Sequence, residues 1–286
     1  MSIILGKLLR LAAGLSLAVP MLGCTPARLL NAVVSKDGYR LEQAIAYGKE
    51  ERQRLDVYVP DQIQDPPKTV VFFYGGRWEF GSRNDYLFVG QALAAKGIIT
   101  VVADYRLYPK VMYPTFIEDA AKSVSWARDT IATYGGDPDQ LYLMGHSAGA
   151  YIAAMLALDE QFLDAEGMSP TDLAGVIGLA GPYDFLPIKD PVIKEIFDVD
   201  PLIETQPIHH AATQAPPFFL LTGDDDVTVL PRNAKVLAEA INTAGGDATT
   251  KTYESIAHVG IMLSFARAFR WLAPVLDDVT DFMKQS

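Results

Sequence analysis

The chain has 286 residues, of which 50% are hydrophobic and 21% are charged, a balance typical of a globular protein with ample core. Its formal net charge of −11 at pH 7 argues against nucleic-acid binding, since phosphate contacts require clustered lysine and arginine side chains. This length suits one large α/β domain or two small ones.

The N-terminal residues 1–23 have the composition of an export signal. Lys7 and Arg10 precede an uncharged stretch, residues 11–27, which is short for a membrane-spanning helix and contains two prolines. This stretch includes MLGC, which ends at Cys24, the only cysteine of the chain, and resembles a bacterial lipoprotein signal with the lipid on that cysteine. Ordinary signal-peptide cleavage and a plain membrane anchor are the alternatives. We expect an exported protein, lipid-anchored in the bacterial cell envelope and facing the periplasm or the exterior.

Strand and helix patterns alternate after a short N-terminal segment, residues 24–54. The predicted strands are short apolar runs, many of them β-branched or aromatic, at 55–59, 69–74, 98–105, 141–144, 175–181, 217–224 and 248–255. The predicted helices lie at 86–97, 114–136, 150–158 and 260–272. Because most strands are unbroken apolar runs, we predict an α/β domain over residues 55–286, with a mostly parallel sheet and helices on both faces.

Residues 182–216 interrupt this alternation. Proline recurs throughout the segment, and residues 192–197 have the pattern of a short helix. Long loops in compact domains are usually functional, and ligands of open α/β folds bind at the carboxyl edge of the sheet. We interpret the segment as a small lid-like insertion, and a passive loop is the alternative.

A lone serine lies between two glycines in Gly145-His146-Ser147-Ala148-Gly149, which joins a predicted strand to a predicted helix. This is the context that the nucleophile-elbow motif G-x-S-x-G requires. A side chain at either glycine would clash in so tight a turn. The serine hydroxyl is then exposed at a helix N-terminus, where the helix dipole favours developing negative charge. Ser147 is therefore the predicted nucleophile, and we expect His146 to pack against or orient the turn.

A serine hydroxyl is a weak nucleophile and needs a base. In folds with this motif the chain order is serine, acid, histidine. Of the four histidines, only His258 comes late enough, between the last predicted strand and the last predicted helix. His258 is therefore the predicted base.

The acid is expected after the strand 217–224, where Asp224, Asp225 and Asp226 are consecutive. Many hydrolases of this type have G-x-x-D-x-x-V here, and Gly223 and Val229 give Asp226 that spacing. We predict that Asp226 fixes the imidazole tautomer and stabilises its positive charge. The other two aspartates are interpreted as solvated turn residues, and no metal site is expected.

An oxyanion hole needs two backbone N–H groups, one of them from the residue after the nucleophile, here Ala148. An early predicted strand runs directly into Gly75-Gly76-Arg77-Trp78, and glycines let the backbone approach a substrate oxygen closely. Gly75 and Gly76 are therefore predicted donors. Arg77 and Trp78 are candidate substrate contacts, with an exposed surface role as the alternative for Arg77.

These segments together resemble the α/β-hydrolase superfamily, and within it the hormone-sensitive-lipase-like carboxylesterases and the kynurenine-formamidase-like, or BD-FAE-like, group. The matching segments run in the expected order over about residues 55–272: YGGRW (74–78), ADYRLYP (103–109), GGDP (135–138), GHSAG (145–149), LAGPYDF (179–185), the turn at Asp226, and His258. Tyr74 stands where the family usually has histidine. It is a candidate substrate contact through its hydroxyl, and packing under the loop is the alternative.

The resemblance implies a serine hydrolase that cleaves short-chain or aryl carboxylic esters through an acyl-enzyme. A small-molecule ester would be the substrate, and no cofactor is expected. The same catalytic groups also serve an arylformamidase-like amide hydrolase or a transacylase. A catalytically inactive binding protein of the cell envelope is the alternative from another class.

Overall fold

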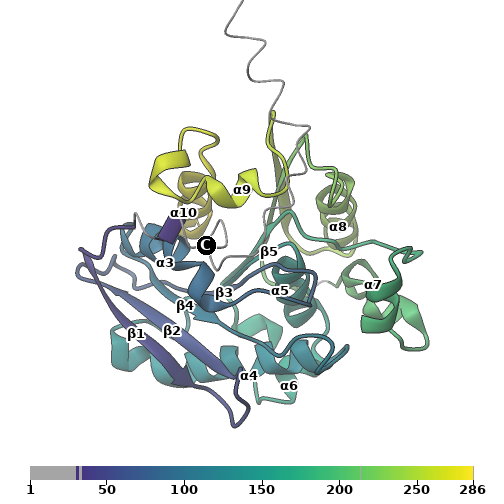
Figure 1. The fold of residues 1–286 in the computed structure, drawn as a ribbon, viewed down its shortest axis with the longest axis horizontal. Helices are drawn as coiled ribbons and strands as arrows, with labels where there is room; N and C mark the ends of the chain where they lie inside the picture. Colours follow the sequence, from purple (N-terminus) through teal and green to yellow (C-terminus); the bar gives the residue numbers. More distant parts are fainter. Residues whose placement is uncertain (1–29, 32–33, 213, 286) are drawn as a thin grey trace, which may run out of the picture.

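The computed structural model describes residues 30–31, 34–212 and 214–285, so the predicted signal segment and Cys24 lie outside the described residues. An eight-stranded sheet with the order β1-β2-β4-β3-β5-β6-β7-β8 forms the centre (Figure 1). Only the pairs β1–β2 and β2–β4 are antiparallel. The strands are β1 (Tyr39–Ala46), β2 (Arg54–Pro60), β3 (Thr69–Phe73), β4 (Ile99–Ala103), β5 (Leu141–His146), β6 (Gly175–Leu179), β7 (Phe218–Gly223) and β8 (Ala248–Tyr253).

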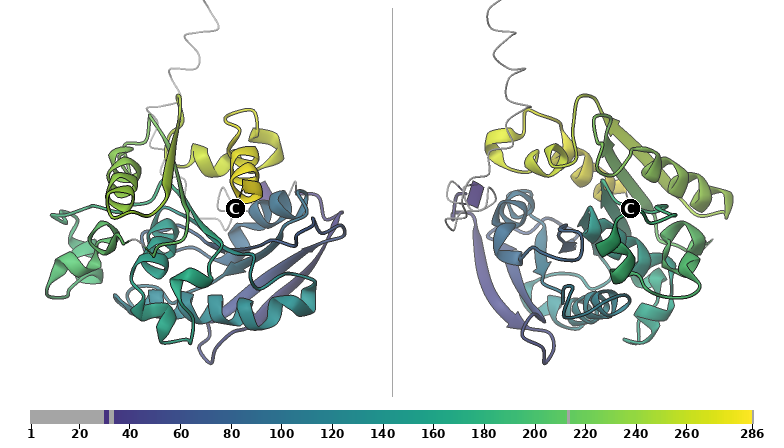
Figure 2. Two further views of the ribbon diagram at one scale, coloured as in Figure 1. Left: turned by 180° about the vertical axis from the view of Figure 1, so that it is seen from behind. Right: turned by 45° about the vertical axis from the view of Figure 1, so that its right-hand side comes forward.

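Helices cover both faces of the sheet (Figures 1 and 2). α4 and α5 pack against each other on one face, whereas α3 and α10 lie on the other (Figure 1). Lys96, two residues after α3, forms a 2.7 Å ion pair with Asp277 of α10. The α-helices are α3 (Leu87–Ala94), α4 (Thr115–Thr130), α5 (Ala148–Leu158), α6 (Gln161–Asp164), α7 (Pro191–Ile196), α8 (Arg232–Thr243), α9 (Gly260–Leu263) and α10 (Val275–Gln285). Short 3-10 helices lie at Arg83–Asp85, Ile131–Tyr134, Pro170–Asp172, Leu202–Thr205, Pro207–His210 and Arg267–Phe269. No helix in the described ranges is both long and apolar enough to cross a bilayer.

The predicted fold class is confirmed, with differences in the elements. β1, within the segment 24–54, pairs with β2 as an edge strand, and neither α8 nor α10 was predicted. The expectation of a helix over 260–272 is wrong, because α9 ends at Leu263. After Leu263 the backbone N–H groups of Phe265 and Ala266 donate to the carbonyls three residues back, at 3.1 and 2.9 Å, so the last turn tightens and the α-helix is not continued.

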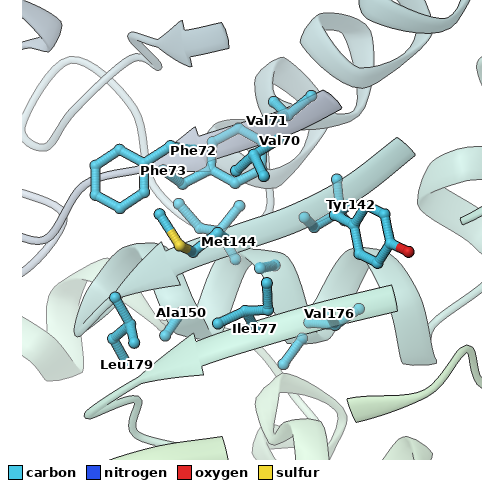
Figure 3. Packing of buried hydrophobic residues seen from close by; sticks show 14 of the residues in the cluster. Val70, Val71, Phe72, Phe73, Tyr142, Met144, Ala150, Val176, Ile177 and Leu179 are labelled. Atoms are coloured by element: carbon cyan, nitrogen blue, oxygen red, sulfur yellow. The ribbon is translucent and has the colours of Figure 1, made fainter. Parts of the chain in front are cut away.

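The central parallel strands lie within the core. Val70, Val71, Phe72 and Phe73 of β3 are all fully buried, so both faces of this strand are covered (Figure 3). The fully buried Met144 and Ile177 of the neighbouring β5 and β6 continue the layer. A strand buried on both faces has no solvent side, which explains why these segments are unbroken apolar runs in the sequence.

The carboxyl edge of the sheet brings distant segments together. The chain passes from β3 to β4 in one direction across the sheet and from β5 to β6 in the other, so the sheet order reverses between β3 and β5. Crevices at such switch points are where ligands of open α/β sheets bind. The loops after β3, β5, β7 and β8 carry the predicted donors, nucleophile, acid and base, and all lie at this edge.

Candidate active site

Ser147 sits on a sharp turn between β5 and α5. Its backbone has φ 54° and ψ −120°, a left-handed conformation that costs a residue other than glycine about 1–3 kcal/mol. The Ser147 N–H donates to the Leu179 carbonyl of β6 at 2.9 Å, which holds the turn against the neighbouring strand. The strain is thus fixed by the sheet, and the hydroxyl is presented at the start of α5.

The two motif glycines are required by contacts with backbone atoms. A Cβ on Gly149 would lie 2.0 Å from the Phe73 carbonyl oxygen, and one on Gly145 would lie 2.2 Å from the Gly149 oxygen. Gly75, in the loop after β3, is also close to the nucleophile turn: a Cβ on Gly75 would lie 3.0 Å from the Ser147 Cβ. The loop after β3 therefore packs directly against the nucleophile turn.

Ser147, His258 and Asp226 form one hydrogen-bonded chain. His258 Nδ1 lies 2.7 Å from Asp226 Oδ2, and His258 Nε2 lies 2.9 Å from Ser147 Oγ. A carboxylate only accepts, so Nδ1 carries the hydrogen and Nε2 accepts from the serine hydroxyl. In this tautomer the imidazole is set to remove the serine proton.

The Asp226 carboxylate is buried and held by its own loop. Its second oxygen, Oδ1, accepts the backbone N–H groups of Thr228 and Val229, each at 2.9 Å. A Cβ at Gly223 would lie 1.9 Å from the Ile256 carbonyl oxygen, so this glycine lets the acid loop approach the loop that carries His258. The spacing used to choose Asp226 thus corresponds to a turn that orients this carboxylate.

His146 links the nucleophile turn to the loop of the base. Its Nε2–H donates to the His258 carbonyl at 3.1 Å, and the two rings are 4.9 Å apart. Burial, with the neighbouring His258 as a second cause, lowers the pKa of His146 to about 3. His146 is therefore neutral near pH 7 and acts as a donor that fixes the position of the His258 backbone.

The predicted oxyanion donors lie beside Ser147. The loop that carries Gly75 and Gly76 packs against the nucleophile turn, and Ala148 follows Ser147 at the start of α5. In the described part of the chain, no backbone–backbone hydrogen bond uses the N–H of Gly75, Gly76 or Ala148. These N–H groups stay the predicted oxyanion donors.

Tyr74 is not placed to contact substrate, which corrects that expectation. The side chain is fully buried and stacks against Tyr105 and Tyr86, with ring centroids 4.9 and 5.4 Å away. Its hydroxyl donates to Asp104 Oδ1 and accepts from Arg52 Nη2, both at 2.7 Å. Burial and the Asp104 carboxylate raise the pKa of this phenol, so it stays protonated and keeps donating. Tyr74 therefore stabilises the oxyanion loop, residues 75–83, through Arg52 and Asp104, which both bind that loop.

Arg52 and Asp104 hold this loop at both ends, and neither was singled out in the sequence. Arg52 Nη2 also donates to the Gly81 carbonyl at 2.8 Å, and Arg52 Nε donates to the Tyr105 carbonyl at 2.8 Å. Asp104 accepts the Arg83 backbone N–H at 2.7 Å and pairs with the Arg83 guanidinium. Arg52 lies in the irregular segment between β1 and β2, where no spacing or composition signal marks it.

Arg77 is paired with acidic groups of the protein. Its guanidinium lies 3.0 Å from Glu79 and 2.9 Å from Asp190, the residue that caps the N-terminus of α7 in the insertion. The hydrogen bond from Arg77 lowers the pKa of the Asp190 carboxyl. This pair connects the insertion 182–216 to the oxyanion loop.

Trp78 is buried in an aromatic cluster and is not an open substrate contact. Its ring meets Phe197 of the insertion and Tyr151 of α5 edge-on, with centroids 4.8 and 5.2 Å away. Phe185 of the insertion joins the same cluster. The insertion is thus packed beside the nucleophile helix, and its predicted role as a lid stays a prediction. Among the described residues, no three His, Cys, Asp or Glu side chains are placed to hold a metal ion.

Solved structures with the same fold include esterases. The apo form of Thermogutta terrifontis esterase 2 matches 88% of this chain and 96% of its own, with a TM-score of 0.72 and 24% identity. A truncated form of a carbohydrate esterase from gut microbiota matches 88% of this chain and 98% of its own, with a TM-score of 0.73 and 18% identity. At these identities the likeness shows the fold.

Relatives in sequence carry esterase names. Isoprenylcysteine alpha-carbonyl methylesterase ICME of Arabidopsis thaliana is 28% identical over 246 residues, which are 78% of this chain and 58% of that protein. Esterase LipC of Mycobacterium tuberculosis is 28% identical over 224 residues, 71% of this chain and 55% of that protein. The chain therefore spans little more than half the length of these relatives.

The sequence model of one family covers most of the catalytic framework. It matches residues 55–241, which include β2, the oxyanion loop, Ser147 and Asp226. With the α/β-hydrolase fold and the geometry of Ser147, His258 and Asp226 in place, the chain belongs to the BD-FAE family.

Proposed function

We propose that this protein is a carboxylic ester hydrolase that cleaves short-chain or aryl esters through an acyl-enzyme on Ser147. The observation that carries the proposal is the unbroken chain from Asp226 through His258 to the Ser147 hydroxyl, with contacts of 2.7 and 2.9 Å. A binding protein without catalysis would not need this alignment on a strained residue. The esterase names of the relatives agree with the proposal.

The geometry supports a two-step acyl transfer. Ser147 Oγ attacks the ester carbonyl carbon while its proton passes to His258 Nε2. The negative charge on the carbonyl oxygen is held by the N–H groups of the oxyanion loop and Ala148. The bond to the alcohol oxygen then breaks, and His258 gives the proton to that oxygen. Water attacks the acyl-enzyme by the same steps and releases the acid.

The test is turnover of p-nitrophenyl acetate by wild type and Ser147→Ala. We expect the variant to lose turnover and labelling by a fluorophosphonate, while a Ser169→Ala variant, changed at the half-buried serine that caps the 3-10 helix Pro170–Asp172, keeps both. Undiminished turnover by Ser147→Ala, or wild type that fails to label, would rule out this site. A matched phenyl ester and N-phenylformamide then compare ester with amide cleavage.

We further propose that the protein is exported and anchored by a lipid on Cys24. The order of basic residues, apolar stretch and lone cysteine supports this, because it is the pattern of a lipoprotein signal. Intact-mass spectrometry of the mature N-terminus tests it. A diacylated cysteine as first residue is expected, and an unmodified N-terminus beyond residue 24 would contradict it.

A further inference from the structure

The 3-10 helix Arg267–Phe269 and the residues after it present a basic and aromatic surface. Trp271 is 79% exposed, and its indole N–H donates to the Ala268 carbonyl at 3.1 Å, which holds the ring beside this helix. Arg267 is exposed on the same helix, and Arg270 is half-buried between the helix and Trp271 in the chain. A large aromatic side chain and two cations therefore share one short segment.

This segment is basic in a chain that is acidic as a whole. Residues 255–276 contain no aspartate or glutamate, although the net charge of the chain is −11. Among the described residues neither arginine forms an ion pair, and the nearby Asp277 is bound by Lys96 at 2.7 Å. Burial lowers the pKa of the Arg270 guanidinium, Asp277 raises it, and Arg267 lowers it again, so the two arginines repel each other. An anion bound beside them would relieve this repulsion.

The described chain begins next to the same segment. Leu30 and Val34 line a groove of about 570 Å³ together with Arg267 and Ala268. Figures 1 and 2 show this start of the chain, in purple, close to the yellow segment that follows α9. Cys24 lies six residues before Leu30, and six residues span at most about 20 Å. A lipid on Cys24 would therefore keep Leu30, and the arginines beside it, close to the membrane.

We propose that Arg267, Arg270 and Trp271 form a membrane-docking surface, which lies against the phosphate groups of an anionic bilayer. The inference rests on the proposed lipid anchor at Cys24 and does not depend on the substrate. Arginine binds phosphate through paired N–H groups, and tryptophan is enriched at membrane interfaces because its ring has an apolar body and a polar N–H. Docking would fix which face of the enzyme is turned toward the bilayer.

The experiment uses the protein purified with its anchor and reconstituted in vesicles of phosphatidylglycerol and phosphatidylcholine. Phosphatidylcholine brominated on its acyl chains quenches the fluorescence of tryptophans that reach the membrane. Trp78 is buried, and Trp126 belongs to α4, on the sheet face away from α3 and α10. We expect quenching of the emission that wild type has and Trp271→Phe lacks. The quenched fraction of this emission gives the ratio of docked to undocked protein.

Charge variants are compared at a phosphatidylglycerol content at which wild type is partly docked. An arginine near an anionic surface contributes about 1 kcal/mol, so Arg267→Gln should lower the docked-to-undocked ratio about fivefold. The double variant with Arg270→Gln should lower this ratio about 25-fold, and vesicles of phosphatidylcholine alone should also lower it. Lys122→Gln removes one positive charge from α4 and should leave the ratio at the wild-type value.

Three outcomes would overturn the docking surface. They are wild type that is not quenched in vesicles rich in phosphatidylglycerol, Trp271→Phe that is quenched as much as wild type, and a ratio that survives the double arginine variant. An intact mass with neither a lipid on Cys24 nor a retained signal segment would remove the anchor, and the docking surface with it.

Ester hydrolysis is tested separately in detergent, where no bilayer is present. All of these variants should hydrolyse p-nitrophenyl acetate at the wild-type rate, which also shows that they are folded. If wild type itself has no turnover, the proposed hydrolase is contradicted, whereas the docking surface still stands or falls by the quenching.

Discussion

Removal of one buried hydroxyl tests whether the network under the oxyanion loop contributes to catalysis. In Tyr74→Phe the ring keeps its stacking on Tyr86 and Tyr105, but Arg52 Nη2 and Asp104 Oδ1 each lose a hydrogen bond of 2.7 Å. Both atoms keep another partner, because Arg52 still donates to Gly81 and Asp104 still accepts the Arg83 N–H.

The expected cost in stability follows from these contacts. A hydrogen bond to a charged group contributes about 1.5–3 kcal/mol, so two such bonds contribute at least about 3 kcal/mol. Because both atoms keep a partner, we expect a loss at or just below that minimum, about 2–3 kcal/mol. Urea denaturation at constant pH measures it. The variant should therefore remain folded at room temperature.

The expected effect on catalysis is larger on kcat than on KM. Loss of one complete oxyanion donor costs about 100- to 1,000-fold in kcat, and a loosened loop loses part of this, about 10- to 100-fold. The oxyanion forms only in the transition state, so KM should change by less than about twofold. Steady-state kinetics on p-nitrophenyl acetate measure both.

A matched variant separates positioning from general destabilisation. Tyr134→Phe removes a hydroxyl that donates to Glu42 at 3.0 Å, in a segment away from the oxyanion loop. This variant should keep the wild-type kcat. If Tyr74→Phe also keeps the wild-type kcat while its stability falls, the network serves folding alone and the positioning argument is refuted.

Three further outcomes follow from the same geometry. Asp226→Asn should lower kcat by about 10⁴-fold, because it favours the wrong tautomer of His258. Asp225→Asn should lower kcat little. A larger loss of kcat in Asp225→Asn than in Asp226→Asn would contradict Asp226 as the catalytic acid. Gly149→Ala places a Cβ 2.0 Å from a backbone oxygen, so we expect its free energy of unfolding, measured by urea denaturation, to fall by about 3 kcal/mol or more. Gly167→Ala is the control, because no atom lies within 4 Å of its Cβ, and its free energy of unfolding should fall by about 1 kcal/mol. The pKa of His146 falls from 6.5 to about 3 on folding, so the unfolded chain binds more protons in that window and stability falls as pH is lowered through it. Between about pH 7 and pH 5 the free energy of unfolding should fall by about 2 kcal/mol from this cause. The His146→Gln variant should not show this fall. If the unfolding free energy of the variant depends on pH as steeply as that of wild type, His146 is not the cause.

The nucleophile turn was predictable because its motif is short: the glycines at 145 and 149 and the strand and helix on either side lie within one stretch of chain. The clash at Gly145 is with the Gly149 oxygen and is local, whereas the clash at Gly149 is with the Phe73 carbonyl of another strand, which the sequence does not show. The chain order of the fold then pointed to the acid and the base. The spacing around Asp226 also proved informative, because it describes a single turn whose N–H groups bind the carboxylate.

Other features depend on contacts across the sheet. Nothing near Arg52 marks it in sequence, because its role arises where the segment before β2 meets the loops after β3 and β4. The segment 260–272 was expected to be one helix, but after Leu263 its N–H groups bond to carbonyls three residues back, and the sequence pattern does not show where this change occurs.

The sequence by itself indicated the parallel sheet and the nucleophile turn, because unbroken apolar runs mark strands buried on both faces and the turn motif spans five residues. The chain order of the fold then indicated the acid and the base. Only the tertiary structure decided what holds the oxyanion loop, that Tyr74 is buried under it, and that Trp78 packs against the insertion. These properties depend on the distances between loops from different strands, which the sheet order and the packing of the helices set.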